Sequence, residues 1–258
     1  MPLPVMMKMR QILRSLVIFI LAMNAAALAG GAFRREQERF PRVRSARAQA
    51  QPRLAALFRA AGLTYPAREI FLRAFKMEGE LELWARNDNG VPFTLVKTYA
   101  VCAASGTVGP KRRQGDLQVP EGFYSVSGFN PWSRFHLSLR VDYPNRADRI
   151  LGGAGDLGGD IFIHGSCVTI GCLPLRDDPI EEVYLAAVDA RDSGQARIPV
   201  HIFPCRFSGG WLKLEREAWR RPGLIDFWRN LKEGYDFFEK DHRLPRVLVT
   251  RDGRYAFQ

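Results

Sequence analysis

Short apolar runs separated by glycine, proline and asparagine fill residues 69–164, and this pattern constrains the fold more than any other. Apolar runs at Leu81 and Leu83 and at Val91 to Val101 flank Asn87-Asp88-Asn89-Gly90. An Asn-Gly step between two such runs is typical of a β-hairpin. Further strands are predicted at Gly122 to Ser127, Phe135 to Val141 and Ile161 to His164. The middle of the chain is therefore predicted to be a mainly β domain.

Helical patterns flank this β region. A short helix is predicted to begin at Pro52 and to end at Gly62, since proline suits the first turn of a helix and glycine suits its end. After the β region, the pattern predicts a helix at Pro179 to Ala190, a strand at Val200 to Pro204, helices within Trp211 to His242 and a hairpin at Arg246 to Phe257 around Asp252-Gly253. The chain is thus predicted to be α+β overall, mainly β with a few helices, and with a helical C-terminal cover that returns a final strand to the core. The predicted organisation is a signal peptide at 1–29, a lead-in segment with a short helix at 30–68, a main domain at 69–205 and a helical C-terminal extension with a closing hairpin at 206–258.

The N-terminus has the pattern of an export signal. Lys8, Arg10 and Arg14 precede an uncharged stretch at 15–33, and Ala27-Leu28-Ala29 supplies the small residues of a cleavage site. The apolar core is shorter than the ~20 residues that a transmembrane helix needs. We therefore expect cleavage after this site and an exported, periplasmic protein. An uncleaved segment that anchors the chain in the inner membrane is the alternative.

The composition limits the class of protein. With 258 residues, 47% of them hydrophobic and 11% aromatic, the chain can fold around a core and is neither disordered nor collagen-like. The formal charge of +11 is spread along the chain, so no arm that binds nucleic acid is predicted. A basic balance suits a protein that works beside an anionic polymer or an acidic membrane surface. A solvated basic surface without a specific partner is the plainer interpretation.

Four cysteines follow the predicted signal: Cys102, Cys167, Cys172 and Cys205. An exported chain can form disulfides. If Cys172 is free, the other three cannot all be paired, and the sequence leaves their pairing open. A metal site is not predicted, because a structural zinc site needs four ligands and the chain offers no further ligand pair at the right spacing.

One segment combines the residues that cysteine chemistry needs. Residues 160–175 read DIFIHGSCVTIGCLPL. A predicted strand delivers His164 to a tight turn, and a glycine-containing loop returns Cys172 eight residues later. A cysteine nucleophile needs a nearby base, because the thiolate attacks and the thiol does not. Gly171 lets the backbone approach a substrate, and the amides of Gly171 and Cys172 are candidates to stabilise an oxyanion. We predict Cys172 as the nucleophile and His164 as its base.

The motifs of this segment resemble those of the L,D-transpeptidase catalytic (YkuD-type) domain. His164-Gly165 followed by Thr169-x-Gly171-Cys172 carries the resemblance, and the short spacer is similar to that of the YafK-like murein transpeptidase branch. Further segments that agree with this branch are Gly109-Pro110-Lys111, Gly115-Asp116, Pro120 to Tyr124, Phe135 to Ser138 and Asp142 to Asn145. The resemblance covers residues 69–205, which would be the catalytic domain.

The resemblance implies a YkuD-like mixed β-sandwich or barrel and an acyl-enzyme mechanism without metal or cofactor. Cys172 would attack an amide carbonyl of a peptidoglycan stem peptide and form a thioester, while His164 takes and returns the proton. A backbone carbonyl near Gly165 would orient the imidazole, and Thr169 would fix the loop. The expected substrate contacts are His136, Tyr143 and Asn145. The expected partners are peptidoglycan stem peptides and wall-linked protein, with no nucleic acid and with the chain as a monomer.

Two departures from the commoner members of the family leave the reaction open. This chain has Ile170 where they place a histidine before the Gly-Cys pair, and its loop after His164 is much shorter. Transfer of the acyl group to an amine is the first interpretation. Hydrolysis is the alternative, by an amidase or carboxypeptidase that cuts stem peptides or releases protein linked to peptidoglycan. A wall-binding module with a decayed site is the third, and the intact His164, Gly171 and Cys172 argue against it.

Overall fold

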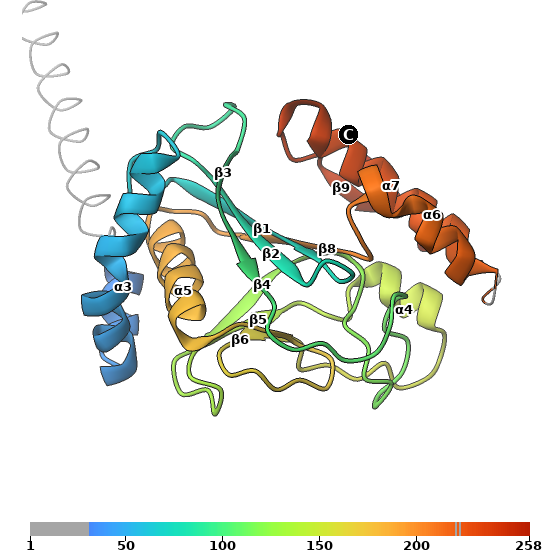
Figure 1. Ribbon diagram of the computed structural model, residues 1–258, viewed down its shortest axis with the longest axis horizontal. Coiled ribbons are helices and arrows are strands. Elements are labelled where there is room, and N and C mark those ends of the chain that lie inside the picture. Colours follow the sequence, from blue (N-terminus) through green and yellow to red (C-terminus); the bar gives the residue numbers. More distant parts are fainter. Residues whose placement is uncertain (1–30, 220, 222) are drawn as a thin grey trace, which may run out of the picture.

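The computed structural model describes residues 31–219, 221 and 223–258 (Figure 1). The helices in chain order are α2 (Ala32–Gln37), α3 (Pro41–Ala60), α4 (Arg146–Gly152), α5 (Asp177–Asp192), α6 (Phe207–Ala218) and α7 (Leu224–Asp241). The strands are β1 (Glu69–Phe75), β2 (Glu80–Arg86), β3 (Thr94–Ala100), β4 (Gly122–Asn130), β5 (Ser138–Val141), β6 (Phe162–His164), β7 (Leu173–Pro174), β8 (Pro199–Phe203), β9 (Val247–Val249) and β10 (Tyr255–Phe257). None of the described helices is both long and apolar enough to span a bilayer. The predicted export signal at 1–29 lies outside the described residues.

Eight strands form one curled sheet in the order β3-β2-β1-β8-β4-β5-β6-β7. The sheet turns at β4, whose residues 122–125 pair with β8 and whose residues from Val126 onward pair with β5. A bulge between Val126 and Gly128 separates the two halves, and a bulge bends a strand and increases its twist. The curl brings the two edge strands together, because the amide of Cys102, after β3, donates to the carbonyl of Pro174 in β7 at 3.0 Å. This sheet with its helices confirms the predicted α+β fold.

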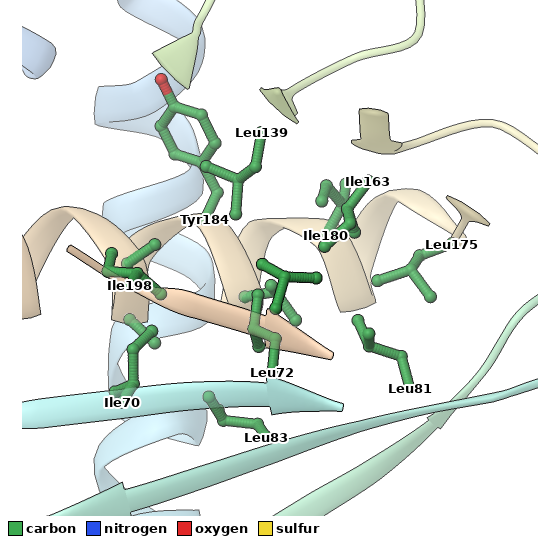
Figure 2. Close-up of a cluster of buried hydrophobic side chains, with 14 of the residues drawn as sticks. Ile70, Leu72, Leu81, Leu83, Leu139, Ile163, Leu175, Ile180, Tyr184 and Ile198 are labelled. Carbon is green, nitrogen blue, oxygen red and sulfur yellow. The ribbon is translucent and has the colours of Figure 1, made fainter. Parts of the chain in front are cut away.

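The central strand β1 shows why the strands read as nearly continuous apolar runs. Ile70 and Leu72 face one side of the sheet and belong to the main core, which α5 covers (Figure 2). Phe71 and Phe75 face the other side, where they contact aromatic side chains of α7. Since helices cover both faces of the sheet, both sets of alternate side chains are buried.

The N-terminal helix α3 begins earlier than predicted. Pro41 occupies its first turn, and Pro52 lies inside a helix of 20 residues. A proline inside a helix costs about 3 kcal/mol. Burial offsets this cost, because one apolar stripe runs past Pro52 in both directions and lies in the main core: Val43, Ala46, Ala50, Leu54 and Phe58. The helix ends near Gly62 as predicted, and the φ of 74° at Gly62 suits a helix C-terminus. The lead-in therefore contains a long helix, residues 41–60, that contributes one stripe of side chains to the core.

The closing hairpin forms as predicted but stands apart from the eight-stranded sheet. β9 and β10 pair with each other as a two-stranded sheet. Asn230 of α7 takes the place of a further strand, because its side-chain amide donates to the Tyr255 carbonyl at 2.9 Å and its oxygen accepts from the Tyr255 amide at 2.7 Å. These bonds satisfy the backbone of a buried residue. The final strand thus returns Tyr255 to a core, beneath α6 and α7, without joining the main sheet.

Candidate active site

His164 and Cys172 lie on neighbouring strands. His164 ends β6, and Cys172 comes immediately before β7, which pairs with β6 in parallel. The register aligns His164 with Pro174, so residues 165–172 form a short loop that leaves β6 and returns beside it. The amide of Leu175 donates to the carbonyl of His164 at 2.7 Å and fixes this return. The structure brings the predicted nucleophile and base to one place.

Both residues line one cavity of about 480 Å³, which we call the groove. Its lining residues are Asn130, Ser133, Arg134, Phe135, Ser138, Asp160, Phe162, His164, Val168, Thr169, Ile170 and Cys172. A second cavity of about 230 Å³, the side cavity, also reaches Cys172 and is walled in part by residues 101–108. Among the described residues, no three His, Cys, Asp or Glu side chains converge in a way that would hold a metal ion. Cys172 therefore opens on two cavities.

The imidazole of His164 is held in one tautomer. Its Nδ1 lies 2.6 Å from the carbonyl oxygen of Gly165, and since a carbonyl only accepts, Nδ1 donates. In the neutral ring, Nε2 is left with its lone pair, which is the form that a general base needs. Burial lowers the pKa of His164 below its usual 6.5, against the opposing effect of the Gly165 carbonyl. The ring is thus neutral at physiological pH and ready to accept a proton.

The thiol of Cys172 is half-buried, with its Sγ 3.6 Å from the carbonyl oxygen of Asp160. Burial raises the pKa of this thiol above its usual 9.0; the Asp160 carboxylate adds to the rise, and the backbone of Phe162 opposes it. Because the pKa of His164 is lowered, the resting site holds a neutral thiol and a neutral imidazole. An attack by this sulfur would therefore need a general base to take the thiol proton.

Thr169 organises the turn before Cys172. Its Oγ1 accepts from the amides of Gly171, at 3.2 Å, and Cys172, at 2.8 Å, and donates to the Cys172 carbonyl at 3.0 Å. Glycine is needed at 171 because φ is 134° and a Cβ would come within 3.1 Å of the carbonyl oxygen of Gln118. Both amides are thus occupied by Thr169 in this structure, and their predicted oxyanion role stays a prediction.

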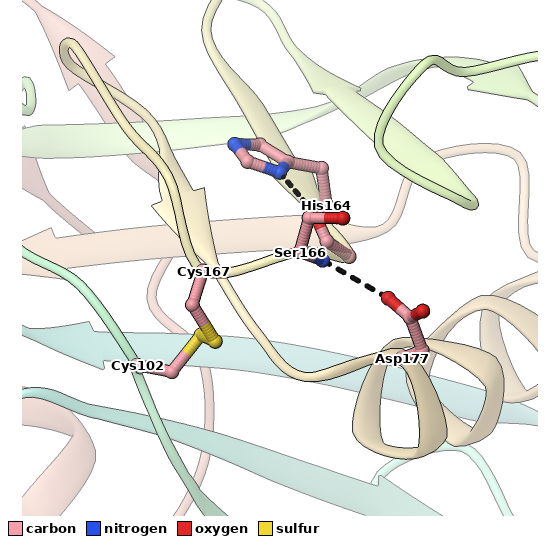
Figure 3. The surroundings of a disulfide bond; sticks show 6 residues. Cys102, His164, Ser166, Cys167 and Asp177 are labelled. Carbon is pink, nitrogen blue, oxygen red and sulfur yellow. Dashed lines mark hydrogen bonds between the residues drawn. A yellow bond between two sulfur atoms is a disulfide. The ribbon is translucent and has the colours of Figure 1, made fainter.

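Two anchors hold the loop 165–172 (Figure 3). A disulfide joins Cys102 to Cys167 and so ties the loop to the opposite edge of the sheet. The carboxylate of Asp177, the first residue of α5, accepts from the amide of Ser166 at 3.0 Å. The pairing that the sequence left open is thereby resolved, and Cys172 is a free thiol.

Three residues around the groove have backbone conformations that favour glycine. The φ angles are 65° at His136, 54° at Asp160 and 66° at Ser166. A non-glycine residue in this region costs on the order of 1–3 kcal/mol and persists only where its surroundings hold it, as at functional sites. The site backbone is therefore held in place by packing and is not relaxed.

The three predicted substrate contacts lie outside the groove lining. Nε2 of His136 bonds to Glu181 of α5 at 2.9 Å. The Tyr143 hydroxyl donates to two main-chain carbonyls, at 3.1 and 3.3 Å, and Asn145 caps the N-terminus of α4. Each side chain has a hydrogen-bond partner within the fold, and a role of these residues in substrate binding stays a prediction.

Sequence reasoning missed one wall of the groove. Asn130, Ser133, Arg134 and Phe135 are far from His164 in sequence. They reach the site because β5 pairs with β6 in a register that places its first residue opposite His164. The ring centre of Phe135 lies 4.8 Å from that of His164. Residues 135–138 resemble a family motif in their sequence. That resemblance does not indicate which side chains face the groove.

Comparison with known proteins places the chain in a family. No protein-family model matches it. Over 189 residues the chain is 36% identical to the Escherichia coli (strain K12) protein named "Putative L,D-transpeptidase YafK", a match that covers 72% of this chain and 73% of the relative. The chain belongs to the L,D-transpeptidase family. The resemblance read from the sequence motifs, including its YafK-like branch, is confirmed.

Two solved structures share a more distant likeness with this L,D-transpeptidase. The helical cell shape determining protein Pgp2 from Campylobacter jejuni is 16% identical, with 70% of this chain and 73% of that chain covered and a TM-score of 0.43. Mycobacterium tuberculosis L,D-transpeptidase 1 is 12% identical, with 52% and 61% covered and a TM-score of 0.29. Likenesses this low carry no argument about function.

The two pKa shifts predict how the site responds to pH. His164 must be neutral to accept a proton, and burial lowers the pKa of its imidazole below the usual 6.5. We expect the acid limb of kcat/KM to have its midpoint below pH 6.5. Alkylation of Cys172 by iodoacetamide should rise through a midpoint above pH 9.0, because the pKa of its thiol is raised. Alkylation that is already maximal at pH 7 would reveal a stored thiolate and contradict this interpretation.

Removal of the disulfide should destabilise the fold. The bridge joins residues 65 positions apart, so replacing Cys102 and Cys167 together by alanine should lower the free energy of unfolding by about 2–4 kcal/mol. Urea denaturation under non-reducing conditions measures this loss. The single variant Cys102→Ala is unsuitable, because its free Cys167 could pair with Cys172. An unchanged urea midpoint in the double variant would show that the sheet holds the loop without the bridge.

Proposed function

We propose that this chain is an exported enzyme that modifies peptidoglycan by acyl transfer through a thioester on Cys172, with His164 as the base. The observation that carries the proposal is the arrangement of this pair. Both side chains line the groove, and the Gly165 carbonyl leaves Nε2 of His164 free to accept a proton. Membership of the L,D-transpeptidase family supports peptidoglycan stem peptides as the substrate class.

The chemistry balances in two half-reactions. In the first, the thiol proton passes to Nε2 of His164 while Sγ of Cys172 bonds to an amide carbonyl carbon of the stem peptide. The tetrahedral adduct expels the amine, which takes the proton from His164 as the C–N bond breaks, and a thioester remains. In the second, an amine of another stem peptide attacks the thioester and gives its proton to His164, which returns it to the departing sulfur.

The side cavity supports transfer over hydrolysis. Cys172 lines both the groove and the side cavity, of about 480 and 230 Å³. A reaction of two peptides needs room for donor and acceptor at one atom, and an acceptor held in position reacts far faster than one drawn from solution. We assign the donor peptide to the groove, where His164 lies, and the acceptor amine to the side cavity.

Hydrolysis is the second candidate, and the exposure of the groove rim favours it. Ile170 is 79% exposed and Val168 is 55% exposed. Ile170 also stands where the commoner members of the family place a histidine. A rim open to solvent admits water to the thioester, which then partitions towards hydrolysis. The products would be a trimmed stem peptide or a protein released from peptidoglycan.

Incubation with purified disaccharide tetrapeptide tests the proposal. Cross-linked dimers in the mass spectrum, with a yield that rises with acceptor concentration, would establish transfer. Loss of the terminal residue, or release of a side-chain-linked peptide, without dimers at high acceptor concentration would establish hydrolysis. If neither product appears and intact-protein mass spectrometry finds no adduct on Cys172, the proposed function is wrong and the wall-binding module is the better account.

Export is part of the proposal. The basic flank, apolar run and small residues of segment 1–29 have the order of a cleaved signal. The disulfide between Cys102 and Cys167 supports export as well, because such bonds persist in oxidising compartments such as the periplasm. N-terminal sequencing of the periplasmic protein should begin near Gly30. Recovery of a membrane-bound chain that retains residues 1–29 would favour the anchored alternative.

A further inference from the structure

The connection between β4 and β5, residues 131–137, forms one wall of the groove and is held by two helices. The guanidinium of Arg42 in α3 donates to the carbonyl of Ser133, at 2.7 Å, and to the carbonyl of His136. From α5, Glu181 bonds to Nε2 of His136 at 2.9 Å. The backbone of this wall is therefore fixed before any substrate binds.

This wall carries the one permanently charged cation of the groove. Among the described residues that line it, Arg134 is the one arginine or lysine and Asp160 is the one carboxylate. Asp160 has a partner of its own, since its carboxylate lies 3.4 Å from the guanidinium of Arg140. Arg134 has no carboxylate within ion-pair distance in the part of the chain that the structure describes. An exposed arginine without a partner adds little to folding stability, so its place in the groove points to a ligand.

We propose that Arg134 binds a carboxylate of the peptide substrate and thereby determines which amide is presented to Cys172. This inference rests on the proposed function of the groove. A guanidinium is a planar fork that pairs with a carboxylate through two parallel hydrogen bonds, and it stays charged throughout the working pH range. The side chains of Phe135, Phe162 and Ile170 line the same groove and are apolar, so they offer no competing partner for the carboxylate.

The carboxylates of a stem peptide lie at its C-terminus and on branches along the chain. The test therefore uses three forms of the disaccharide tetrapeptide: all carboxylates free, only the C-terminal one amidated, and all the others amidated. The proteins compared are the wild type, Arg134→Gln and Arg134→Lys. The matched control is Arg229→Gln, which removes the same charge from an exposed position on α7.

Arg134→Gln should lower kcat/KM about tenfold on the peptide with all carboxylates free, mainly through KM, because one charged hydrogen-bonded contact is lost. Amidation of the recognised carboxylate should lower the kcat/KM of the wild type to that of the variant. The same amidation should leave the kcat/KM of Arg134→Gln unchanged. Arg134→Lys should recover part of the loss, since it keeps the charge without the fork. The Arg229→Gln control should have the kcat/KM of the wild type on every peptide.

Calorimetric binding in a Cys172→Ala background gives a readout that does not depend on turnover. There, Arg134→Gln should weaken binding of the free-carboxylate peptide about tenfold and leave binding of the recognised amidated form unchanged. The role of Arg134 would be overturned if Arg134→Gln weakened binding of all three peptides equally, or if Arg229→Gln weakened binding as much. A wild-type protein that binds the carboxylate through Arg134 but forms no thioester would uphold this inference and contradict the proposed function.

Discussion

The Cys172→Ala variant should show no turnover of disaccharide tetrapeptide, with a free energy of unfolding within about 1 kcal/mol of the wild type. Without the sulfur no thioester forms, so neither transfer nor hydrolysis can proceed. The stability cost is small because this half-buried side chain opens on two cavities and is not packed in the core. Product analysis by mass spectrometry and urea denaturation of the same preparation measure the two effects. Cys172→Ser should be nearly inactive as well, because a hydroxyl is a poorer nucleophile with this base.

Cys205→Ala is the matched control for this prediction. Cys205 is the other free cysteine of the described residues, and it is fully buried in the cluster beneath α6 and α7. Its loss should reduce stability through packing and leave kcat unchanged, which is the reverse of the result for Cys172. Wild-type activity in Cys172→Ala, with activity lost in a variant of another cysteine, would show that the nucleophile has been misassigned.

His164→Ala should slow acylation of Cys172 by about 10²–10⁴-fold at neutral pH, the usual worth of a general base. The thiol has a raised pKa, so without Nε2 to take its proton only a small thiolate fraction remains to attack. Peptide binding should be largely retained. The rate of thioester formation, followed by rapid quench and intact-protein mass spectrometry, isolates this step from the second half-reaction.

His242→Asn is the control for His164, because it replaces a histidine at the C-cap of α7, outside the groove lining. Asparagine tolerates the left-handed conformation that His242 adopts there, with φ of 54°. This variant should acylate at the wild-type rate. A His164→Ala protein that acylates as fast as His242→Asn would remove His164 from the mechanism.

Local signals account for what could be predicted from the sequence. The Asn89-Gly90 step lies between β2 and β3 as predicted, because that turn depends on the conformation of a few adjacent residues. His164 and Cys172 meet in one groove because only a short loop separates them, and the paired strands β6 and β7 hold both ends of it.

The parts that could not be predicted depend on contacts between distant segments. Pro52 looked like a helix start, but an apolar stripe on both sides of it packs into the core and overrides that local preference. The Gly171 amide looked free until the rotamer of Thr169 was known. Arg134 lies in the groove because β5 pairs with β6 and because Arg42 of α3 bonds to the β4–β5 connection. Both contacts join segments far apart in the sequence, so no local sequence pattern predicts them.

The joining of the two sheet edges at Cys102 and Cys167 bears on how the protein matures. In an unfolded chain Cys167 is close in sequence to Cys172 and 65 positions from Cys102. Chain entropy then favours the non-native, short-range bridge by about 2 kcal/mol, and that bridge would consume the proposed nucleophile. The folded sheet counters this preference, because it places the end of β3 beside β7, where the Cys102 amide meets the Pro174 carbonyl. We therefore expect correct oxidation to depend on closure of this edge, and a variant that delays closure to yield more of the non-native Cys167–Cys172 bridge.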